Sequence, residues 1–336
     1  MNTAHHYPAI GVLRWTRRDI ATITLISVVP PICYSQLGWH WVAIPWLPVA
    51  LLGTAVAFMA GFKNNASYDR TWEARRVWGA IVNASRVWGA FSRDYLRAAP
   101  GEDRDVAAET HQLVLRHLGW LTALRFALRE PRAWESMNNA SNAEFRRAWF
   151  KVDEQDNPLE PALARYLSPE ELPLVMGKAN KAAQIIALQS AHLARLRERG
   201  LLDDFRHIEL ARVLTELLAQ QGASERIKNF PYPRQYATMN LWFVRLFVAL
   251  IPFGMIQEFS KLGPEMIWFS VPFSVLAGWV FNTMEKIGEG TENPFEGSAN
   301  DVPITAMSRG IEIDLRQMIG DPDVPPPLTA VNQILT

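Results

Sequence analysis

The chain has 336 residues, which is enough for one or two domains with a sizeable core. Its 34 basic residues balance its 34 acidic residues, so the net charge gives no indication of a nucleic-acid partner. Cys33 is the only cysteine, which excludes an intrachain disulfide framework.

Charged residues are absent from a long stretch near the N-terminus. From Ile20 to Phe62 there is no Asp, Glu, Lys or Arg, although 20% of the whole chain is charged. Because a membrane-spanning helix needs about 20 apolar residues, this stretch predicts two spans, Ile20–Leu37 and about Val42–Phe62, joined by a short turn. Pro45 and Pro48 fall in the first turns of the second span, where proline costs least.

The next stretch, from Lys63 to about Pro233, is charged and predicts a water-soluble helical layer. Apolar residues recur there at three- and four-residue spacing, and strand signals are scarce. No proline separates the second span from this layer, so we expect one helix to leave the membrane and continue into it. The expected helices are 64–98, 104–130, 140–151, about 174–199 and about 203–220, the last ending near Gly222, with a loop at 152–162.

Two further apolar runs predict a second pair of spans. Residues 237–256 are apolar apart from Arg245, and Met266–Met284 carries no charge. Arg245 is either a functional intramembrane charge or a side chain that snorkels to the interface, and both interpretations stay open here. Four spans in two hairpins place both termini on one side, which the positive-inside rule makes cytoplasmic. The basic residues that flank the spans on that side are Arg14, Arg17, Arg18, Lys63, Arg70 and Arg234.

The sequence thus predicts an all-α membrane protein with four transmembrane helices. Its expected regions are an N-terminal segment with the first transmembrane hairpin (1–62), a helical cytoplasmic region (63–236), a second transmembrane hairpin (237–284) and a cytoplasmic tail (285–336). Within the tail, residues 293–304 predict an ordered turn that docks onto the body. Residues 321–328 predict a proline-rich extended stretch.

Catalytic motifs are missing from the chain, which predicts that it is not an enzyme. There is no Gly-rich phosphate loop, nucleophile elbow or HExxH pattern. A membrane-bound haem or redox protein is the alternative of another class, but it needs paired histidines on facing spans. Only His40 lies near a span, so we expect no cofactor.

The residues after the second span carry a recognisable motif. Phe62-Lys63-Asn64-Asn65 is followed by Tyr68-Asp69-Arg70-Thr71-Trp72-Glu73-Ala74-Arg75-Arg76-Val77-Trp78-Gly79. This stretch resembles the signature of the bestrophin family, whose bacterial members commonly read FRN-N-x-x-YDRWWEARKLWG. The four-span layout and Asn293-Pro294-Phe295 match as well, so the resemblance covers roughly 15–315. It implies a homopentameric ion channel of the bacterial inner membrane, with one axial pore lined by the second transmembrane helix.

In the family, three pore-facing positions four residues apart on the second span form a hydrophobic neck. Counted back from Arg70, the resemblance places them at Thr54, Phe58 and Phe62. Residues at i, i+4 and i+8 share one helix face, so five copies would stack rings of these side chains around an axis. The alternative is an aromatic stripe that packs against neighbouring helices. Thr54 departs from the aliphatic residue that is usual at its position.

A second constriction of the family lies deep in the cytoplasmic region. The local match IIALQSAHL points to Ile186, with Ile185 as the second choice. A core isoleucine on an amphipathic helix is the alternative interpretation.

Animal bestrophins also hold calcium in an acidic run after the Asn-Pro-Phe motif. Here that run offers only Glu296 and Asp301, whereas calcium takes about six to eight oxygen ligands. We therefore expect no calcium clasp, no other metal site and no calcium gating. Asn293 and Asp301 are expected to cap or brace the turn instead.

The charged residues of the signature lie at three- and four-residue spacings, which suits ion pairs inside the helix or with a neighbouring subunit. We interpret them, with one tryptophan, as a structural brace for the junction between membrane and cytoplasm. The brace residues are Asp69, Arg70, Trp72, Glu73 and Arg76.

The permeant ion is expected to be monovalent, with an anion such as chloride favoured by the aromatic neck. The ring edges of Phe58 and Phe62 carry partial positive charge, which favours an anion in a narrow, dry passage. Phenyl faces would instead favour a cation, so a sodium-selective channel of the same fold is the alternative.

Overall fold

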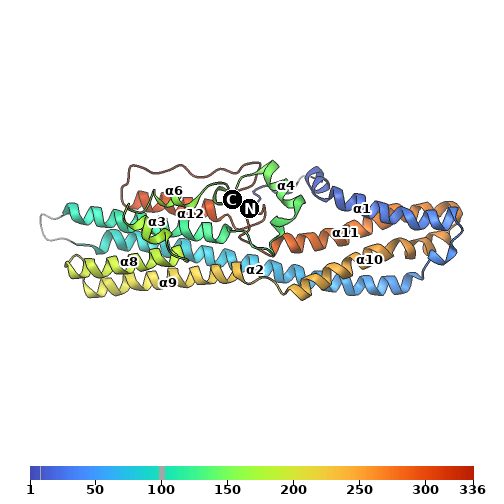
Figure 1. Cartoon of the computed structure of the whole chain (residues 1–336), viewed down its shortest axis with the longest axis horizontal. Helices are drawn as coiled ribbons and strands as arrows, with labels where there is room; N and C mark the ends of the chain where they lie inside the picture. The colour runs from blue at the N-terminus through green and yellow to red at the C-terminus, as the bar shows by residue number, and fades with distance from the viewer. Residues whose placement is uncertain (8, 98–102) are drawn as a thin grey trace.

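Two helical bundles lie end to end and share one long helix (Figure 1). The computed structural model describes residues 1–7, 9–97 and 103–336, and within these residues the regular elements are all helical. The α-helices are α1 (Ala9–Gln36), α2 (Trp46–Tyr95), α3 (Asp103–Arg129), α4 (Ala140–Trp149), α5 (Asp153–Asp156), α6 (Leu159–Leu163), α7 (Glu171–Met176), α8 (Lys181–Glu198), α9 (Asp204–Asn229), α10 (Arg234–Ser260), α11 (Ser270–Thr291) and α12 (Ile304–Met318). Short 3-10 helices are η1 (His40–Val42), η2 (Ser136–Asn138) and η3 (Pro264–Phe269).

The shared helix is α2, which runs without a break from Trp46 to Tyr95. At 1.5 Å per residue its 50 residues span about 75 Å, enough to cross a membrane and continue well beyond it. The prediction of one continuous helix through both regions is confirmed. The predicted span from about Val42 agrees with the apolar segment that begins at His40, whereas the regular helix begins at Trp46, after Pro45.

The first bundle consists of α1, α10, α11 and the N-terminal half of α2. Small residues allow close packing: a Cβ at Gly53 would lie 2.6 Å from Phe247, and one at Gly278 would lie 2.9 Å from Ile23. The segments that are long and apolar enough to cross a membrane are His40–Tyr95, Arg234–Ser260 and Pro264–Thr291. α1 packs alongside them against α10 and α11. A bundle of this composition belongs in a membrane.

The first helix of this bundle starts earlier than expected. α1 begins at Ala9 and not at Ile20. Its first turns lie beside α4, where Arg17 and Arg18 both pair with Glu144, at 2.9 and 3.1 Å. The basic residues before Ile20 therefore belong to the same helix as the apolar run.

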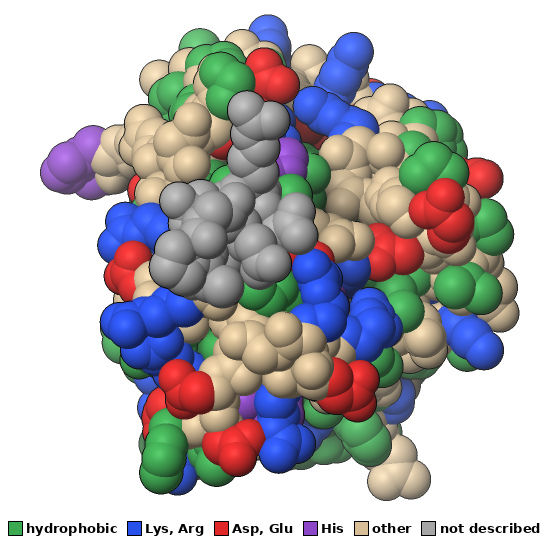
Figure 2. Space-filling model, turned by 90° about the vertical axis from the view of Figure 1, so that its left-hand side faces the viewer, with side chains coloured by type: hydrophobic (Ala, Val, Ile, Leu, Met, Phe, Trp, Pro, Cys, Tyr) green, Lys and Arg blue, Asp and Glu red, His purple; other side chains and the backbone are tan. Residues whose placement is uncertain are grey.

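The second bundle packs α3, α8, α9 and α12 around the C-terminal half of α2. Its core contains the fully buried Trp78, Trp88 and Trp120. Gly89 allows α12 to lie directly on α2, since a Cβ there would collide with Leu315. Figure 2 shows the end face of this bundle, where Lys and Arg are interspersed with Asp and Glu as on a surface that faces water.

The helices of the second bundle differ from those predicted in three places. The expected loop at 152–162 contains the short helices α5 and α6. The expected helix 174–199 is divided into α7 and α8, and the Asn180 side chain caps α8 by accepting from the Ala183 backbone N–H. α9 continues past Gly222, because the following turns, which include the buried Ile227, pack along α2.

The tail returns to the body as predicted. Residues 292–297 are buried, whereas 321–328 have no regular structure. α12 lies between these stretches and was not part of the sequence-based expectation. The two ends of the chain meet, with an isolated antiparallel bridge between Asn2 and Ile334 (Figure 1).

Candidate functional site

Thr54, Phe58 and Phe62 form an exposed stripe on α2, which we call the α2 stripe. Phe58 is 65% exposed and Phe62 is 64% exposed, and Thr54 is also exposed. Leu47 and Leu51 continue the same exposed face toward the start of the helix. The two phenyl rings therefore do not pack against helices of their own chain. Within one subunit, this excludes the alternative that the aromatic stripe serves only to pack neighbouring helices together.

The opposite face of α2 is closely packed against α10 and α11. Val49, Gly53, Val56 and Ala60 are buried there, and the Phe247 ring of α10 lies against Gly53. The helix thus has one face committed to its own bundle and one that is left for lipid or for another copy of the chain.

A buried ion pair lies next to the stripe at the end of the apolar region. Lys63 Nζ pairs with the Glu285 carboxylate of α11, and the Asn240 amide of α10 donates to the same carboxylate. The Lys63 and Glu285 side chains are only 3% and 5% exposed. From the sequence, Lys63 was identified only as a basic residue that flanks a span, and this pairing was not predicted. The signal that would find it is that Lys63 and Glu285 are the first charges after their two apolar runs.

Side chains of α2 also hold the C-terminal ends of two other helices. Arg70 Nε donates to the Glu292 carbonyl after α11 at 2.8 Å, and a terminal nitrogen donates to the Ile227 carbonyl of α9 at 2.8 Å. The Thr71 hydroxyl donates to the Thr291 carbonyl at 3.0 Å. The last carbonyls of a helix lack helical partners, and a cation suits that end of the helix dipole. Burial lowers the pKa of Arg70 from its usual value, yet a guanidinium stays charged at neutral pH.

The remaining brace residues are more exposed. Glu73 pairs with Arg226 of α9 at 2.5 Å, so the pairing partner is another helix of the same chain. Trp72 is 49% exposed. Asp69 and Arg76 are exposed and have no partner among the residues that the structure describes. Arg70 and Glu73 thus tie α2 to α9 and α11, whereas the roles of the other three residues stay predictions.

The two isoleucines of the predicted aperture lie on α8 in the core of the second bundle. Ile186 is 7% exposed and Ile185 is fully buried. Of the two, Ile186 is the less completely buried, and the aperture itself stays a prediction.

The acids of the tail turn are engaged by donors from the protein. Glu296 accepts from the Ser136 backbone N–H at 2.8 Å and from the Ser136 hydroxyl at 2.6 Å. Asp301 pairs with Arg129 at 3.1 Å and accepts from the Gly297 N–H at 2.7 Å, so it braces the turn. Burial, together with the nearby Asp301 carboxylate, raises the pKa of Glu296 well above its usual value. Within the described residues, no group of three His, Cys, Asp or Glu is arranged as a metal site.

Arg245 lies on the exposed face of α10. Its guanidinium carbon is 5.9 Å from the centroid of the Trp242 ring, about one helical turn nearer the second bundle. The side chain therefore leans in the direction that snorkelling requires.

Comparison with known proteins places these features in one family. Residues 11–317 match the family model described as Bacterial/Fungal Bestrophin protein. The voltage-dependent anion channel-forming protein YneE of Escherichia coli (strain K12) is 28% identical over 304 residues, covering 90% of this chain and 85% of that protein. The voltage-dependent anion channel-forming protein RSc3414 of Ralstonia nicotianae is 32% identical over 289 residues, covering 85% of this chain and 82% of that protein. These names confirm the prediction that the chain is not an enzyme.

The fold has a solved counterpart as well. The crystal structure of a bacterial bestrophin homologue from Klebsiella pneumoniae superposes with a TM-score of 0.70 at 27% identity, covering 90% of this chain and 97% of that chain. Sequence and fold agree over nearly the whole length, from the α2 stripe to α12. The chain therefore belongs to the bacterial and fungal bestrophin family.

Proposed function

We propose that five copies of this chain form a channel for monovalent anions such as chloride, with the α2 stripe lining one axial pore. The exposed stripe is the observation that carries the proposal. Phe58 and Phe62 present phenyl rings to the outside of the chain at the end of an apolar helix, directly beside a packed and charged junction. Family membership and the channel names of the relatives support it.

The proposed neck consists of stacked rings of Thr54, Phe58 and Phe62. A narrow passage lined by phenyl groups opposes the passage of a fully hydrated ion and gates by dewetting. The Thr54 hydroxyl donates to the Ala50 carbonyl at 3.0 Å, so its methyl group contributes to the lining while the donor is satisfied. Ile186 is proposed as a second constriction farther along the axis. Conduction is passive and requires no cofactor.

Selectivity depends on which part of the phenyl ring meets the ion. Ring edges favour an anion, and we propose that the rings present their edges. One observation favours the cation alternative: Asp69 follows Phe62 by seven residues, is exposed on the same side of α2, and would form an acidic ring below the neck. The relatives named as anion channels favour the first assignment.

We further propose four transmembrane helices, with α1 as the fourth, and both termini on the cytoplasmic side of the bacterial inner membrane. α1 has 28 residues and packs against α10 and α11 within the apolar bundle. The charged second bundle, the basic flanks and both chain ends lie on the same side of this bundle.

A reversal potential in asymmetric salt tests the proposal. Purified full-length protein is reconstituted in planar bilayers, and wild type is compared with Phe58→Ala and with Phe273→Ala. Phe273 is a matched control because it is a 51% exposed phenylalanine on α11, outside the stripe. We expect an anion reversal potential in the wild type, and Phe58→Ala should raise the conductance or shift the selectivity while Phe273→Ala behaves as wild type.

Two results would overturn these assignments. A cation reversal potential in the wild type rejects the anion channel and directs attention to Asp69. Equal conductance and selectivity in wild type and Phe58→Ala removes Phe58 from the neck. Pentamer formation is checked separately, by the mass of the purified assembly.

A further inference from the structure

A cavity of 420 Å³ in the second bundle lies apart from the α2 stripe. Its walls come from α3, α6, α12 and the segment before α6, and Leu328 of the tail also lines it. α12 separates the cavity from α2, on which it packs at Gly89. The cavity is therefore neither part of the proposed pore nor open to the membrane.

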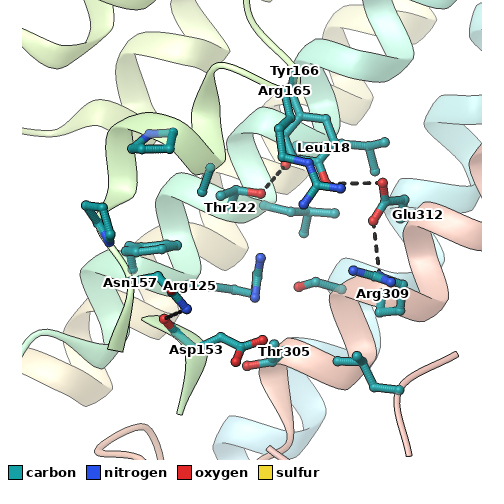
Figure 3. Close-up of a pocket in the computed structure, with 17 residues that line it drawn as sticks. Leu118, Thr122, Arg125, Asp153, Asn157, Arg165, Tyr166, Thr305, Arg309 and Glu312 are labelled. Atoms are coloured by element: carbon teal, nitrogen blue, oxygen red, sulfur yellow. Dashed lines mark hydrogen bonds and ion pairs between the residues drawn. The ribbon is translucent and has the colours of Figure 1, made fainter. Parts of the chain in front are cut away.

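Three guanidinium groups converge on this cavity (Figure 3). Arg125 reaches in from α3, Arg309 from α12, and Arg165 from the turn after α6. Two acids, Asp153 and Glu312, line the same cavity, so the lining carries one more positive than negative charge. Cationic side chains in excess inside a cavity favour an anionic ligand.

Glu312 and Glu154 are engaged by donors of the protein, although Oε2 of Glu154 lacks a hydrogen-bond partner. Glu312 accepts from the Tyr166 hydroxyl at 3.1 Å and pairs with Arg309 and Arg316 at 3.3 and 3.2 Å. Arg125 pairs with the buried Glu154. Arg165 has no partner among the described residues, and the Asp153 carboxylate in the same lining has none either.

Two buried polar groups, from two helices that line the cavity, lack a hydrogen-bond partner. They are Nε of Arg125, on α3, and the hydroxyl oxygen of Ser308, on α12. An unsatisfied buried donor is costly, and a carboxylate offers two acceptor oxygens at once. Around these donors the walls are apolar, with Leu118, Leu121 and Phe126 from α3. The cavity thus combines two free donors, one excess positive charge and an apolar floor.

We propose that this cavity binds a small organic monocarboxylate with an apolar body. The carboxylate accepts from Arg125 Nε and the Ser308 hydroxyl, Arg165 supplies the compensating charge, and the apolar body lies on the α3 wall. The site is independent of ion conduction, because no residue of the α2 stripe contributes to it.

Binding is tested on the full-length protein in detergent, with benzoate as the probe. Benzamide is the neutral isostere, and inorganic phosphate is an oxyanion without an apolar body. At constant chloride and ionic strength, we expect benzoate to raise the melting temperature, while benzamide and phosphate leave it unchanged. Calorimetric titration then gives the dissociation constant.

Two variants locate the site. Arg165→Gln and Ser308→Ala should each weaken benzoate binding about tenfold, which is what loss of one hydrogen bond to a charged group costs. Arg165 is exposed, and the Ser308 hydroxyl is unpartnered, so neither change should lower the melting temperature without ligand. Arg147→Gln, an exposed change on α4, and Phe58→Ala, in the α2 stripe, should bind benzoate as wild type does.

The outcomes separate clearly. Equal effects of benzoate and benzamide, or wild-type affinity in both Arg165→Gln and Ser308→Ala, would reject the site. Phosphate that competes as well as benzoate would reject the apolar body of the ligand. Loss of benzoate binding in Phe58→Ala would place the ligand in the pore instead of in this cavity.

Discussion

The buried pair of Lys63 and Glu285 allows a sharp test of how the junction is held. Replacing Lys63 by Met leaves the Glu285 carboxylate buried with the Asn240 amide as its remaining described partner. Breaking a buried ion pair by removing one partner costs about 3–5 kcal/mol. Glu285→Gln leaves the Lys63 ammonium buried without a counter-charge, so we expect a loss of the same order.

The stability of the double variant distinguishes the cost of an unpaired buried charge from a simple loss of contacts. Replacing a buried pair by uncharged side chains of similar volume is often nearly neutral, because the desolvation cost disappears with the charges. Lys63→Met combined with Glu285→Gln should therefore be more stable than either single variant. At about 2 °C per kcal/mol for a chain of this size, each single variant should lose about 6–10 °C in Tm.

The measurement is the Tm of the purified protein in detergent, followed by tryptophan fluorescence, for wild type, both single variants and the double variant. The matched control is the exposed pair of Arg86 and Asp314, whose side chains are 52% and 32% exposed at 2.8 Å. Arg86→Met should cost less than about 1 kcal/mol. If Lys63→Met loses no more than Arg86→Met, or if the two single losses simply add in the double variant, the junction is not held by this pair.

Two further predictions concern the second bundle. Arg70→Lys removes the planar guanidinium that reaches both the Glu292 and Ile227 carbonyls, so it should lower the free energy of unfolding by about 1.5–3 kcal/mol. The control is Arg76→Lys at an exposed position, which should lower it by almost nothing. Chemical denaturation of both variants measures the difference. Burial lowers the pKa of His117 from 6.5 to about 3, so folding favours its neutral form and stability falls as pH drops below 6.5. Between pH 7 and 5 the loss should be about 2 kcal/mol, and it should vanish in His117→Gln; an equal pH slope in that variant would refute the assignment.

Local composition was enough to predict the apolar helices and the continuity of α2. The uncharged stretch from Ile20 to Phe62, together with a helix pattern that no proline interrupts, is a property of neighbouring residues. The shared face of Phe58 and Phe62 likewise follows from their spacing, although their role in a neck rests on the family resemblance. The ends of these helices were predicted less well, since α1 begins at Ala9 and not at Ile20.

Tertiary contacts explain what could not be predicted. Gly222 reads as a helix end, but α9 continues because its next turns bury Ile227 along α2. The pairing of Lys63 with Glu285 joins residues more than two hundred positions apart, and the sequence pattern of either helix alone does not predict it. The cavity between α3 and α12 depends on a helix that was not expected at all.

The contacts between α2 and α11 explain how the α2 stripe is aimed. Lys63 and Arg70 are seven residues apart on α2. Their partners are also seven residues apart, since Glu285 lies on α11 and Glu292 directly follows it. Both contacts therefore lie along one seam between two parallel helices. At about 100° per residue, Phe58 points roughly 140° away from Lys63 and Phe62 roughly 100° away. Holding Lys63 and Arg70 against α11 therefore turns both phenyl rings away from the bundle. The orientation of the proposed neck is thus determined by residues that never touch it.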